Sequence, residues 1–393
     1  MRVLQLISSV NPSGGGTIEG LKQLGLVLLH QGHVVEVACL DAPDSSWLNT
    51  FPLKIYALGP SISGYRYSKN FVPWLRQNAA NYDVVIVNGI WQYSSFGVWL
   101  ALHSLRKRNS HTPPYFVFTH GMLDPWFKRT YPLKHLKKWL YWPWAEYRVL
   151  RDAQAVLFTC EEERILARET FWLYKCNEIV VNFGTAAPTG DPPAQRQTFL
   201  NQFPELCHKR LLLFLSRIHV KKGCDLLIKA FAKVAKSDDS LHLVMAGPDQ
   251  TGWQAELQKQ ANQLGIAQKI AWTGILSGDL KWGAFYAAEV LVLPSHQENF
   301  GIVVAEAMAC GVPVLISNKV NIWREIAADG AGLVANDDLD GTTQLLQKWL
   351  AMPPEEQQTM QQKAQKCFME RFEIHKTAKI LIDTLHAHGV PLP

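Results

Sequence analysis

The sequence predicts an α/β protein of two doubly wound domains, each a parallel sheet covered by helices on both faces. Its 393 residues exceed what one ordinary core accommodates and suit two domains of roughly 150 to 200 residues. Strand-like apolar runs alternate with helix-length amphipathic stretches through both halves, which is the pattern of parallel sheets. Two such domains facing each other would leave a deep cleft, and ligands bind beyond the carboxyl ends of the strands.

The apolar runs that we interpret as strands form two sets of five. Between the sets, segment 184–206 is rich in Pro, Gly, Thr and Gln, so we interpret it as an exposed connection containing the domain boundary. The stretch 353–388 is predicted to be helical and charged. We therefore expect domains over 1–190 and 191–370, followed by a helical segment, 371–393, that packs back on the first domain. The predicted strands are 3–7, 34–40, 84–87, 115–119 and 155–159, then 211–215, 242–246, 270–272, 290–293 and 313–316.

Composition excludes several classes of protein. The formal charge of +5 is small for this length and does not indicate nucleic acid as a partner. Seven scattered cysteines form no CxxC pair, and we expect them to be reduced thiols. The N-terminal apolar run is too short for a signal peptide, and no segment offers the roughly 20 apolar residues of a membrane-spanning helix. We expect a cytoplasmic protein whose membrane contact, if any, is at the surface.

The first loop carries three consecutive glycines, Gly14, Gly15 and Gly16, after a strand and before a helix. Glycine lets the backbone approach an anion closely, and a helix N-terminus supplies unpaired amides and partial positive charge. The spacing does not fit GxGxxG, although Asp41 stands where a dinucleotide-binding acid would be. We favour a loop that faces an anion or a sugar; a nicotinamide site and a plain turn are the alternatives.

In "FVFTHGMLDPW", His120 and Gly121 directly follow an apolar strand. A polar residue at the carboxyl end of such a strand can hydrogen-bond a ligand, whereas the alternative is a histidine that only caps its loop. Segment 128–151 then interleaves Lys and Arg with Trp and Tyr, which suits docking into an anionic membrane interface. The alternative is an ordinary helix with its aromatic residues in the core and its lysines in solvent.

In the second half, "LFLSRIHVKKG" places Arg217 and Lys222 in a loop between a strand and a helix. Arginine presents a planar fork to phosphate oxygens and lysine a point charge, so the two could converge on one diphosphate.

The segment "HQENFGIVVAEAMACGVP" places two glutamates around a helix start that we expect near Phe300 or Gly301. Glu298 precedes this helix, whose first amides are available to an anion. Glu306 lies one to two turns on, among apolar neighbours, so its carboxylate needs a partner, which sugar hydroxyls could provide. The alternative is that Glu298 is a favourable N-terminal charge and Glu306 a solvated helix position.

These motifs, "SRIHVKKG", "ENFGIVVAE", the "HG" pair and the early glycine loop, resemble those of retaining glycosyltransferases of family 4, which have the GT-B fold. The resemblance covers nearly the whole chain in motif order. The stretch "THGMLDPW", with the basic aromatic segment after it, is similar to bacterial members that build exopolysaccharide, capsule or lipopolysaccharide. Ser216 is a small departure, since many relatives have glycine there.

The resemblance implies roles for these residues. Arg217 and Lys222 would bind the diphosphate of a nucleotide sugar. Glu306 would take the ribose hydroxyls, and Glu298 the hydroxyls of the donor sugar, while His120 reaches the transferred sugar. The first domain would then form the acceptor side and the second would bind the donor. Backbone groups complete the predicted site at Gly15, Gly16, Gly274, Ile275, Asn299, Phe300, Gly301 and Ile302.

The activity so implied is transfer of a hexose, with glucose from UDP-glucose favoured, to a glycan or lipid-linked acceptor in cell-envelope polysaccharide synthesis. Retention would need no enzymatic nucleophile, and the cationic clamp would make a metal or cofactor unnecessary. The protein would lie in the cytoplasm or on the inner face of the plasma membrane. The rivals are a sugar-nucleotide epimerase on the same fold and a non-catalytic protein that only binds nucleotide sugars.

Overall fold

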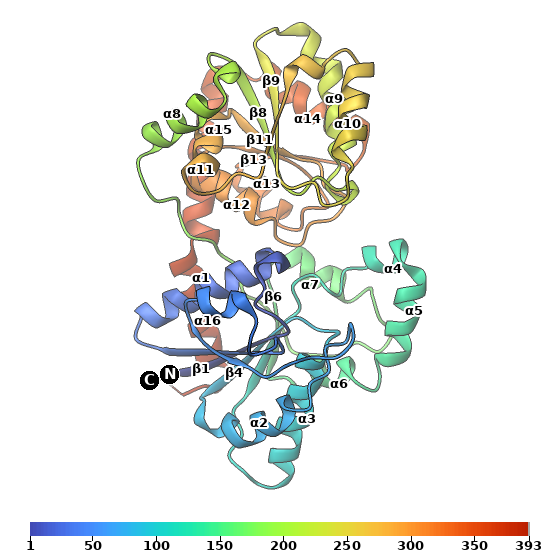
Figure 1. Ribbon diagram of the computed structural model, residues 1–393, viewed down its shortest axis with the longest axis vertical. Coiled ribbons are helices and arrows are strands. Elements are labelled where there is room, and N and C mark those ends of the chain that lie inside the picture. Colours follow the sequence, from blue (N-terminus) through green and yellow to red (C-terminus); the bar gives the residue numbers. More distant parts are fainter. Residues whose placement is uncertain (392–393) are drawn as a thin grey trace. The chain divides into compact units, whose positions relative to one another are not determined.

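The computed structural model describes residues 1–391, which form two compact units with one parallel sheet each (Figure 1). Unit 1 comprises Met1–Gly184 and the chain from Ile374 onward, and unit 2 is Thr185–Glu373. Each unit is a Rossmann-like α/β structure, so the predicted pair of doubly wound domains is confirmed. The chain leaves unit 1 after Gly184 and returns at Ile374, whereas the domains were predicted to end at 190 and 370.

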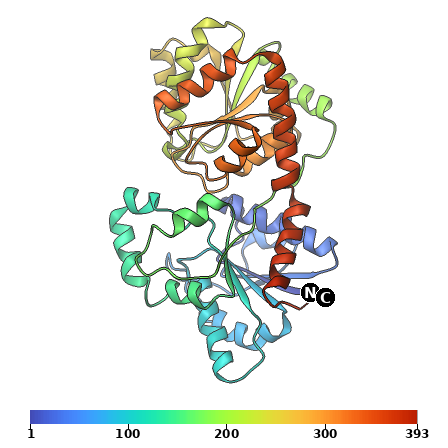
Figure 2. The same cartoon turned by 180° about the vertical axis from the view of Figure 1, so that it is seen from behind.

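Unit 1 contains a seven-stranded sheet in the order β3-β2-β1-β4-β5-β6-β7. Its side chains alternate between two cores: one lies under α1 and α16, the other under α2, α3 and α6. Figure 2 shows α16, in red, against the first of these faces. The strand order reverses between β1 and β4, where ligands bind in such sheets. The strands are Arg2–Ile7 (β1), Val34–Cys39 (β2), Lys54–Ala57 (β3), Val84–Asn88 (β4), Tyr115–Phe118 (β5), Ala155–Phe158 (β6) and Glu178–Val180 (β7).

The helices of unit 1 connect these strands and cover both faces of the sheet. The last of them, α16, comes from the C-terminal end of the chain and packs on α1. These helices are Gly16–His30 (α1), Phe71–Asn78 (α2), Tyr93–Lys107 (α3), Trp126–Thr130 (α4), Pro132–Tyr141 (α5), Glu146–Asp152 (α6), Glu161–Ala167 (α7) and Ile374–Ala387 (α16).

Unit 2 contains a six-stranded parallel sheet in the order β10-β9-β8-β11-β12-β13, which reverses between β8 and β11. Helices α9, α10 and α14 cover one face, and α8, α11, α12, α13 and α15 lie on the other (Figure 1). The strands are Arg210–Leu215 (β8), Leu241–Ala246 (β9), Ile270–Gly274 (β10), Val290–Leu293 (β11), Val314–Ser317 (β12) and Gly332–Ala335 (β13). The helices are Pro192–Gln202 (α8), Cys224–Val234 (α9), Gln254–Gln263 (α10), Gly278–Ala287 (α11), Ile302–Ala309 (α12), Trp323–Asp329 (α13), Leu339–Ala351 (α14) and Pro354–Cys367 (α15).

The structure corrects the predicted connection over 184–206. Residues 192–202 form α8, which begins at the N-cap Asp191 and packs against α11. Gln195 is buried there and donates a hydrogen bond to Asp279 Oδ1 at 2.8 Å. The Pro and Gln content that suggested an exposed loop therefore reflects a helix with Pro at its first positions, where a missing N–H costs no hydrogen bond.

Candidate active site

The loops that follow β8 and β11 lie side by side, because these strands are neighbours at the point where the sheet order of unit 2 reverses. The first loop carries Arg217 and Lys222, and the second carries Glu298. Gly223, with φ +67°, makes their close approach possible, since a Cβ there would clash with the Pro294 carbonyl oxygen. The backbone N–H of His296 donates to Lys221 O at 2.9 Å and joins the two loops.

Lys222 and Glu298 form an ion pair between Nζ and Oε2. The Lys222 side chain is 7% exposed and that of Glu298 is 22% exposed, so the pair is largely shielded from water. Burial opposes ionisation of Glu298, but the charge and hydrogen bond of Lys222, with Lys221 and Arg217 nearby, hold its pKa below the usual range. Glu298 is thus an anion at neutral pH, and its charge holds the lysine in place.

The backbone of Glu298 is held on both sides. Its N–H donates to Lys319 O at 2.9 Å, and its carbonyl oxygen accepts from Asn321 N at 2.9 Å. Gly301 follows in the left-handed region with φ 72° and caps α12, which begins at Ile302, slightly later than predicted. The first bond of the helix turn runs from Val304 N to Gly301 O, so the Ile302 amide has no acceptor within the helix.

Glu306 lies within α12 and is buried, with 9% of its surface exposed. Lys281, from α11, donates from Nζ to Glu306 Oε1 at 2.8 Å. The partner that this buried carboxylate was expected to need is thus present in the chain itself, where the sequence had suggested the hydroxyls of a sugar. Lys281 escaped detection because it lies 25 positions away in another helix, in a stretch that carries no motif.

Arg217 is exposed, and its Nη1 lies 3.5 Å from Gln250 Oε1. Within residues 1–391 it pairs with no carboxylate. Gly274 ends β10 with φ 68° and accepts a hydrogen bond from Gly247 N at 2.7 Å, and Ile275 beside it is 71% exposed. The carboxyl edge of this sheet thus presents an unfilled guanidinium, a buried ion pair, and exposed backbone.

In unit 1, His120 follows β5 and takes an unusual backbone conformation, with φ 48°. Its Nε2 lies 3.1 Å from Oδ1 of Asn88, at the end of β4. The Asn88 amide nitrogen donates to Gln5 Oε1 at 2.8 Å, so Asn88 Oδ1 must accept and His120 Nε2 carries the proton. Burial lowers the pKa of His120 to about 4. His120 is thus neutral, with Nδ1 as a hydrogen-bond acceptor.

Glu163 shapes the loop around His120. Its carboxylate accepts from Thr119 Oγ1 at 2.7 Å and Gly121 N at 2.5 Å, and from Thr159 N and Oγ1 at 2.8 and 2.6 Å. The sequence analysis missed both Glu163 and Asn88. The signal was present in Asn88, a polar residue that ends an apolar strand, as His120 does.

The glycine loop of unit 1 lies at the start of α1. Gly15 is the N-cap, with φ 77°, and is exposed, as is Gly16. Asp41 does not stand free for a ribose: it is buried and accepts from Ser9 Oγ at 2.6 Å and from Val10 N at 2.8 Å. It therefore fixes the loop after β1, which removes the one residue that favoured a nicotinamide site.

The aromatic residues of the basic aromatic segment 128–151 are of two kinds, buried and exposed. Trp142 is fully buried and stacks on Phe171 with ring centroids 4.3 Å apart, whereas Trp139 and Trp144 are exposed.

No helix in the described chain has the length and hydropathy to cross a membrane. Nor do three or more His, Cys, Asp or Glu side chains of residues 1–391 gather in a way that could hold a metal ion.

Two family models match the chain, one in each half. Residues 195–367 match "Glycosyl transferases group 1", and residues 15–181 match "Glycosyl transferase 4-like domain". The chain belongs to the group 1, GT4-like glycosyltransferases. The predicted family is confirmed at this level, and both models fall on the sheets whose carboxyl edges are described above.

Individual relatives of this glycosyltransferase chain share part of its sequence or its fold. A D-inositol 3-phosphate glycosyltransferase of Thermomonospora curvata is 39% identical over 137 residues, which is 33% of this chain and 32% of that protein. The matched region thus spans about a third of the curated relative's length. Anabaena Alr3699/HepE, in complex with UDP and glucose, has 17% identity and a TM-score of 0.73 over 98% of this chain and 100% of its own. Sucrose-phosphate synthase of Thermosynechococcus elongatus has 19% identity and a TM-score of 0.76 over 98% of both chains. The likeness of these structures confirms the GT-B fold.

Proposed function

We propose that this chain is a retaining glycosyltransferase that transfers a hexose from a nucleotide sugar to a glycan or lipid-linked acceptor. The observation that carries the proposal is the group formed by Arg217, Lys222 and Glu298 at the strand-order reversal of unit 2. UDP-glucose is the donor that we favour, because the structural neighbour HepE has been crystallised with UDP-glucose. A role in envelope polysaccharide synthesis is supported by the likeness to WaaG, a glycosyltransferase involved in lipopolysaccharide biosynthesis.

The donor's diphosphate would take the place next to the two cations of unit 2. The guanidinium of Arg217, which pairs with no carboxylate of the described chain, suits two phosphate oxygens. Lys222 would weaken its bond to Glu298 and bind a third phosphate oxygen. Glu298, released in part, would accept from a hydroxyl of the donor sugar, and the amides of Asn299, Phe300, Gly301 and Ile302 would complete the phosphate site. Glu306, oriented by Lys281, would accept from the ribose hydroxyls, with the base near Gly274 and Ile275.

The reaction breaks the bond between the anomeric carbon and the phosphate oxygen. Positive charge grows on the sugar and negative charge on the leaving diphosphate, which Arg217 and Lys222 would stabilise. We propose that the acceptor attacks from the face that the diphosphate leaves, and that the leaving phosphate takes the acceptor's proton. No enzymatic nucleophile and no metal ion are needed for this route.

Unit 1 would provide the acceptor side, through Gly15, Gly16 and His120. The neutral His120 ring, with its proton on Nε2, can accept a hydrogen bond from a sugar hydroxyl at Nδ1. An imidazolium there would instead repel the positive charge that develops at the anomeric carbon. The partly buried position of His120, which keeps the ring neutral, thus suits a residue that contacts the transferred sugar.

An epimerase would need a base near the sugar to abstract a proton. The acid beside His120 is Glu163, and its two oxygens accept four hydrogen bonds from the loops that they hold. With both oxygens engaged in holding these loops, the carboxylate is not placed to abstract a proton from a sugar. This observation favours transfer over epimerisation.

The test is a panel of UDP-, GDP- and ADP-sugars, assayed for release of free nucleotide with and without candidate acceptors. The acceptors include lipid-linked sugars and inositol phosphate, since a relative is a D-inositol 3-phosphate glycosyltransferase. We expect acceptor-dependent release of UDP from UDP-glucose that survives excess EDTA. Interconversion of donors without release of nucleotide would support the epimerase, and tight donor binding without turnover or hydrolysis would support a binding protein.

A further inference from the structure

Helix α5 (Pro132–Tyr141) has no buried residue, and three leucines dominate one of its faces. Leu133, Leu136 and Leu140 are 78%, 54% and 60% exposed, and their spacing of three and four residues places them in one row. Exposed indoles extend this apolar surface: Trp139 lies beside Trp172, with ring centroids 6.2 Å apart. Isolated exposed leucines are ordinary, but a contiguous row next to exposed indoles indicates an interaction surface.

The opposite side of α5 carries His135 and Lys138, which pack on the protein. Lys138 Nζ lies 4.5 Å from the ring centroid of Trp91, and the ring of His135 stacks on Phe171 at 4.9 Å. Lys134 joins them in lining a cavity under the helix. A surface helix ordinarily buries its apolar face and exposes its charged one. Helix α5 instead leaves its row of leucines exposed, so this row is available to a partner outside the described chain.

The charge around this surface indicates the kind of partner. Between Asp124 and Glu146 the sequence contains five Lys and Arg residues and no acid. Three of the five, Lys128, Arg129 and Lys137, are exposed and do not take part in the cation–aromatic contacts of α5 with Tyr131, Trp91 and Phe127. A second copy of the chain seated face to face would bring two such cationic rims together, which opposes self-association. An anionic bilayer attracts the rim and accepts the leucines and indoles.

We propose that α5, with its Trp139 and the neighbouring Trp172, docks on an anionic membrane by its leucine face. Leu133, Leu136 and Leu140 enter the interface, and Lys128, Arg129 and Lys137 meet the headgroup phosphates, while His135 and Lys138 stay packed on the protein. Lys138 faces inward, over the ring of Trp91, and therefore does not contact lipid. Docking needs no nucleotide sugar, so this proposal and the proposed activity can fail separately.

The experiment measures partition of the full chain onto vesicles of phosphatidylcholine alone and of phosphatidylcholine with phosphatidylglycerol. The decisive variant, Leu136→Ser with Leu140→Ser, removes apolar surface and leaves the charge unchanged. We expect the wild type to bind the anionic vesicles, the double variant to bind at least tenfold more weakly, and Lys137→Gln to bind about fivefold more weakly. Leu29→Ser is the matched control, because Leu29 is 44% exposed in the last turn of α1, and it should bind like the wild type.

Each contrary outcome overturns the proposal. Equal binding of the wild type and the leucine double variant to anionic vesicles would mean that the basic residues alone make the contact. Failure of the wild type to bind anionic vesicles, with sedimentation as a monomer, would assign the leucine face to a protein partner. A wild-type dimer that Leu136→Ser with Leu140→Ser dissociates would assign it to a second copy. Melting temperatures near that of the wild type show that the variants are folded, as expected for exposed leucines.

Discussion

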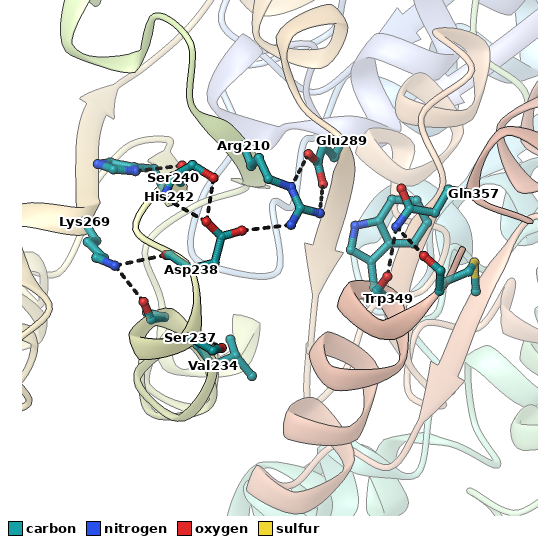
Figure 3. Close-up of polar contacts among 12 residues, drawn as sticks. Arg210, Val234, Ser237, Asp238, Ser240, His242, Lys269, Glu289, Trp349 and Gln357 are labelled. Atoms are coloured by element: carbon teal, nitrogen blue, oxygen red, sulfur yellow. Dashed lines mark hydrogen bonds and ion pairs between the residues drawn. The ribbon is translucent and has the colours of Figure 1, made fainter. Parts of the chain in front are cut away.

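One arginine begins strand β8 and another lies two residues beyond its end, and the two have opposite surroundings. At the amino end, Arg210 donates from Nε and Nη2 to both oxygens of Glu289, at 2.8 and 2.9 Å, and from Nη1 to Asp238 at 2.9 Å (Figure 3). Just beyond the carboxyl end, Arg217 has a single long contact, with Gln250. The first fork is filled by the protein's own carboxylates, and the second is unfilled.

This difference separates groups that hold the fold from groups that can bind a ligand. Lys269, at the same amino edge, donates to Ala235 O at 2.6 Å and Asp238 O at 3.0 Å, and so closes a loop (Figure 3). At the carboxyl edge Lys222 is paired too, but with Glu298, itself a proposed ligand contact. A cation fully bonded to the chain cannot take a phosphate without breaking the structure, whereas Arg217 can do so at no such cost.

The largest expected effect is that of Lys222→Ala, which breaks the ion pair of the carboxyl edge. We expect kcat/KM to fall by roughly 100- to 1,000-fold, because one stabilising group for the leaving diphosphate is lost. The variant also leaves the Glu298 carboxylate without its partner, so its melting temperature should fall. Lys222→Ala combined with Glu298→Gln removes that stranded charge, and should recover the melting temperature but not turnover.

The matched control for this variant is Lys229→Ala, which removes a lysine whose side chain is 40% exposed and pairs with Asp225 in α9. It should leave both turnover and melting temperature nearly unchanged. Wild-type turnover in Lys222→Ala would refute the proposed clamp.

Exchange of either arginine, Arg210 or Arg217, for alanine tests the comparison directly. Arg217→Ala should lower kcat/KM by about 10- to 100-fold with an unchanged free energy of unfolding. Arg210→Ala should lower the free energy of unfolding by about 1–2 kcal/mol, because Glu289 and Asp238 lose their partner. It should leave KM for the donor unchanged, because Arg210 lies at the amino edge of the sheet, away from the proposed donor site. Urea unfolding gives the free energy of unfolding of each variant, and steady-state kinetics give its kcat/KM and its KM for the donor. An equal loss of turnover in the two would erase the distinction between the edges.

The two glutamates of the carboxyl edge should differ in what they recognise. Glu306→Gln should weaken binding of UDP and of UDP-glucose alike, by about tenfold, because both ligands carry the ribose. Glu298→Gln should weaken binding of UDP-glucose more than that of UDP, because only the former carries the sugar. Isothermal titration of both ligands against both variants provides the measurement. If Glu298→Gln weakened binding of UDP and of UDP-glucose equally, Glu298 would act at the phosphates, through its ion pair with Lys222, and not at the sugar.

The sequence was sufficient to predict the central strands and to predict that His120, Arg217 and Glu298 lie in loops after strands. All ten predicted strands are present, whereas β3, β7 and β13 were missed. These three lie at sheet edges, where strands are short and half-exposed, so the continuous apolar run that marks a central parallel strand is absent. The helix start in "ENFGIVVAE" could be located because Gly and an apolar run mark it.

The supporting residues of the site could not be predicted in the same way. Lys281 and Glu163 act through bonds to residues 25 and 44 positions away in the chain. Such pairs depend on which helix packs beside which strand end, and no local pattern in the sequence encodes that. His120 could be singled out by its position after β5, but its neutral state depends on the burial that the fold creates.

The smallest expected effect concerns that neutral state. The folded protein keeps the pKa of His120 at about 4, below the ordinary value of 6.5. Between these values the unfolded chain binds a proton that the folded chain refuses, so the free energy of unfolding falls as pH falls. From pH 7 to 5.5 this residue alone should account for a loss of about 1 kcal/mol. Urea unfolding of the wild type and of His120→Asn isolates the contribution, since asparagine tolerates the positive φ and does not titrate. Equal pH slopes in the two proteins would mean that His120 is as free to protonate in the folded chain as in the unfolded one, and the proposed neutral acceptor at Nδ1 would be lost.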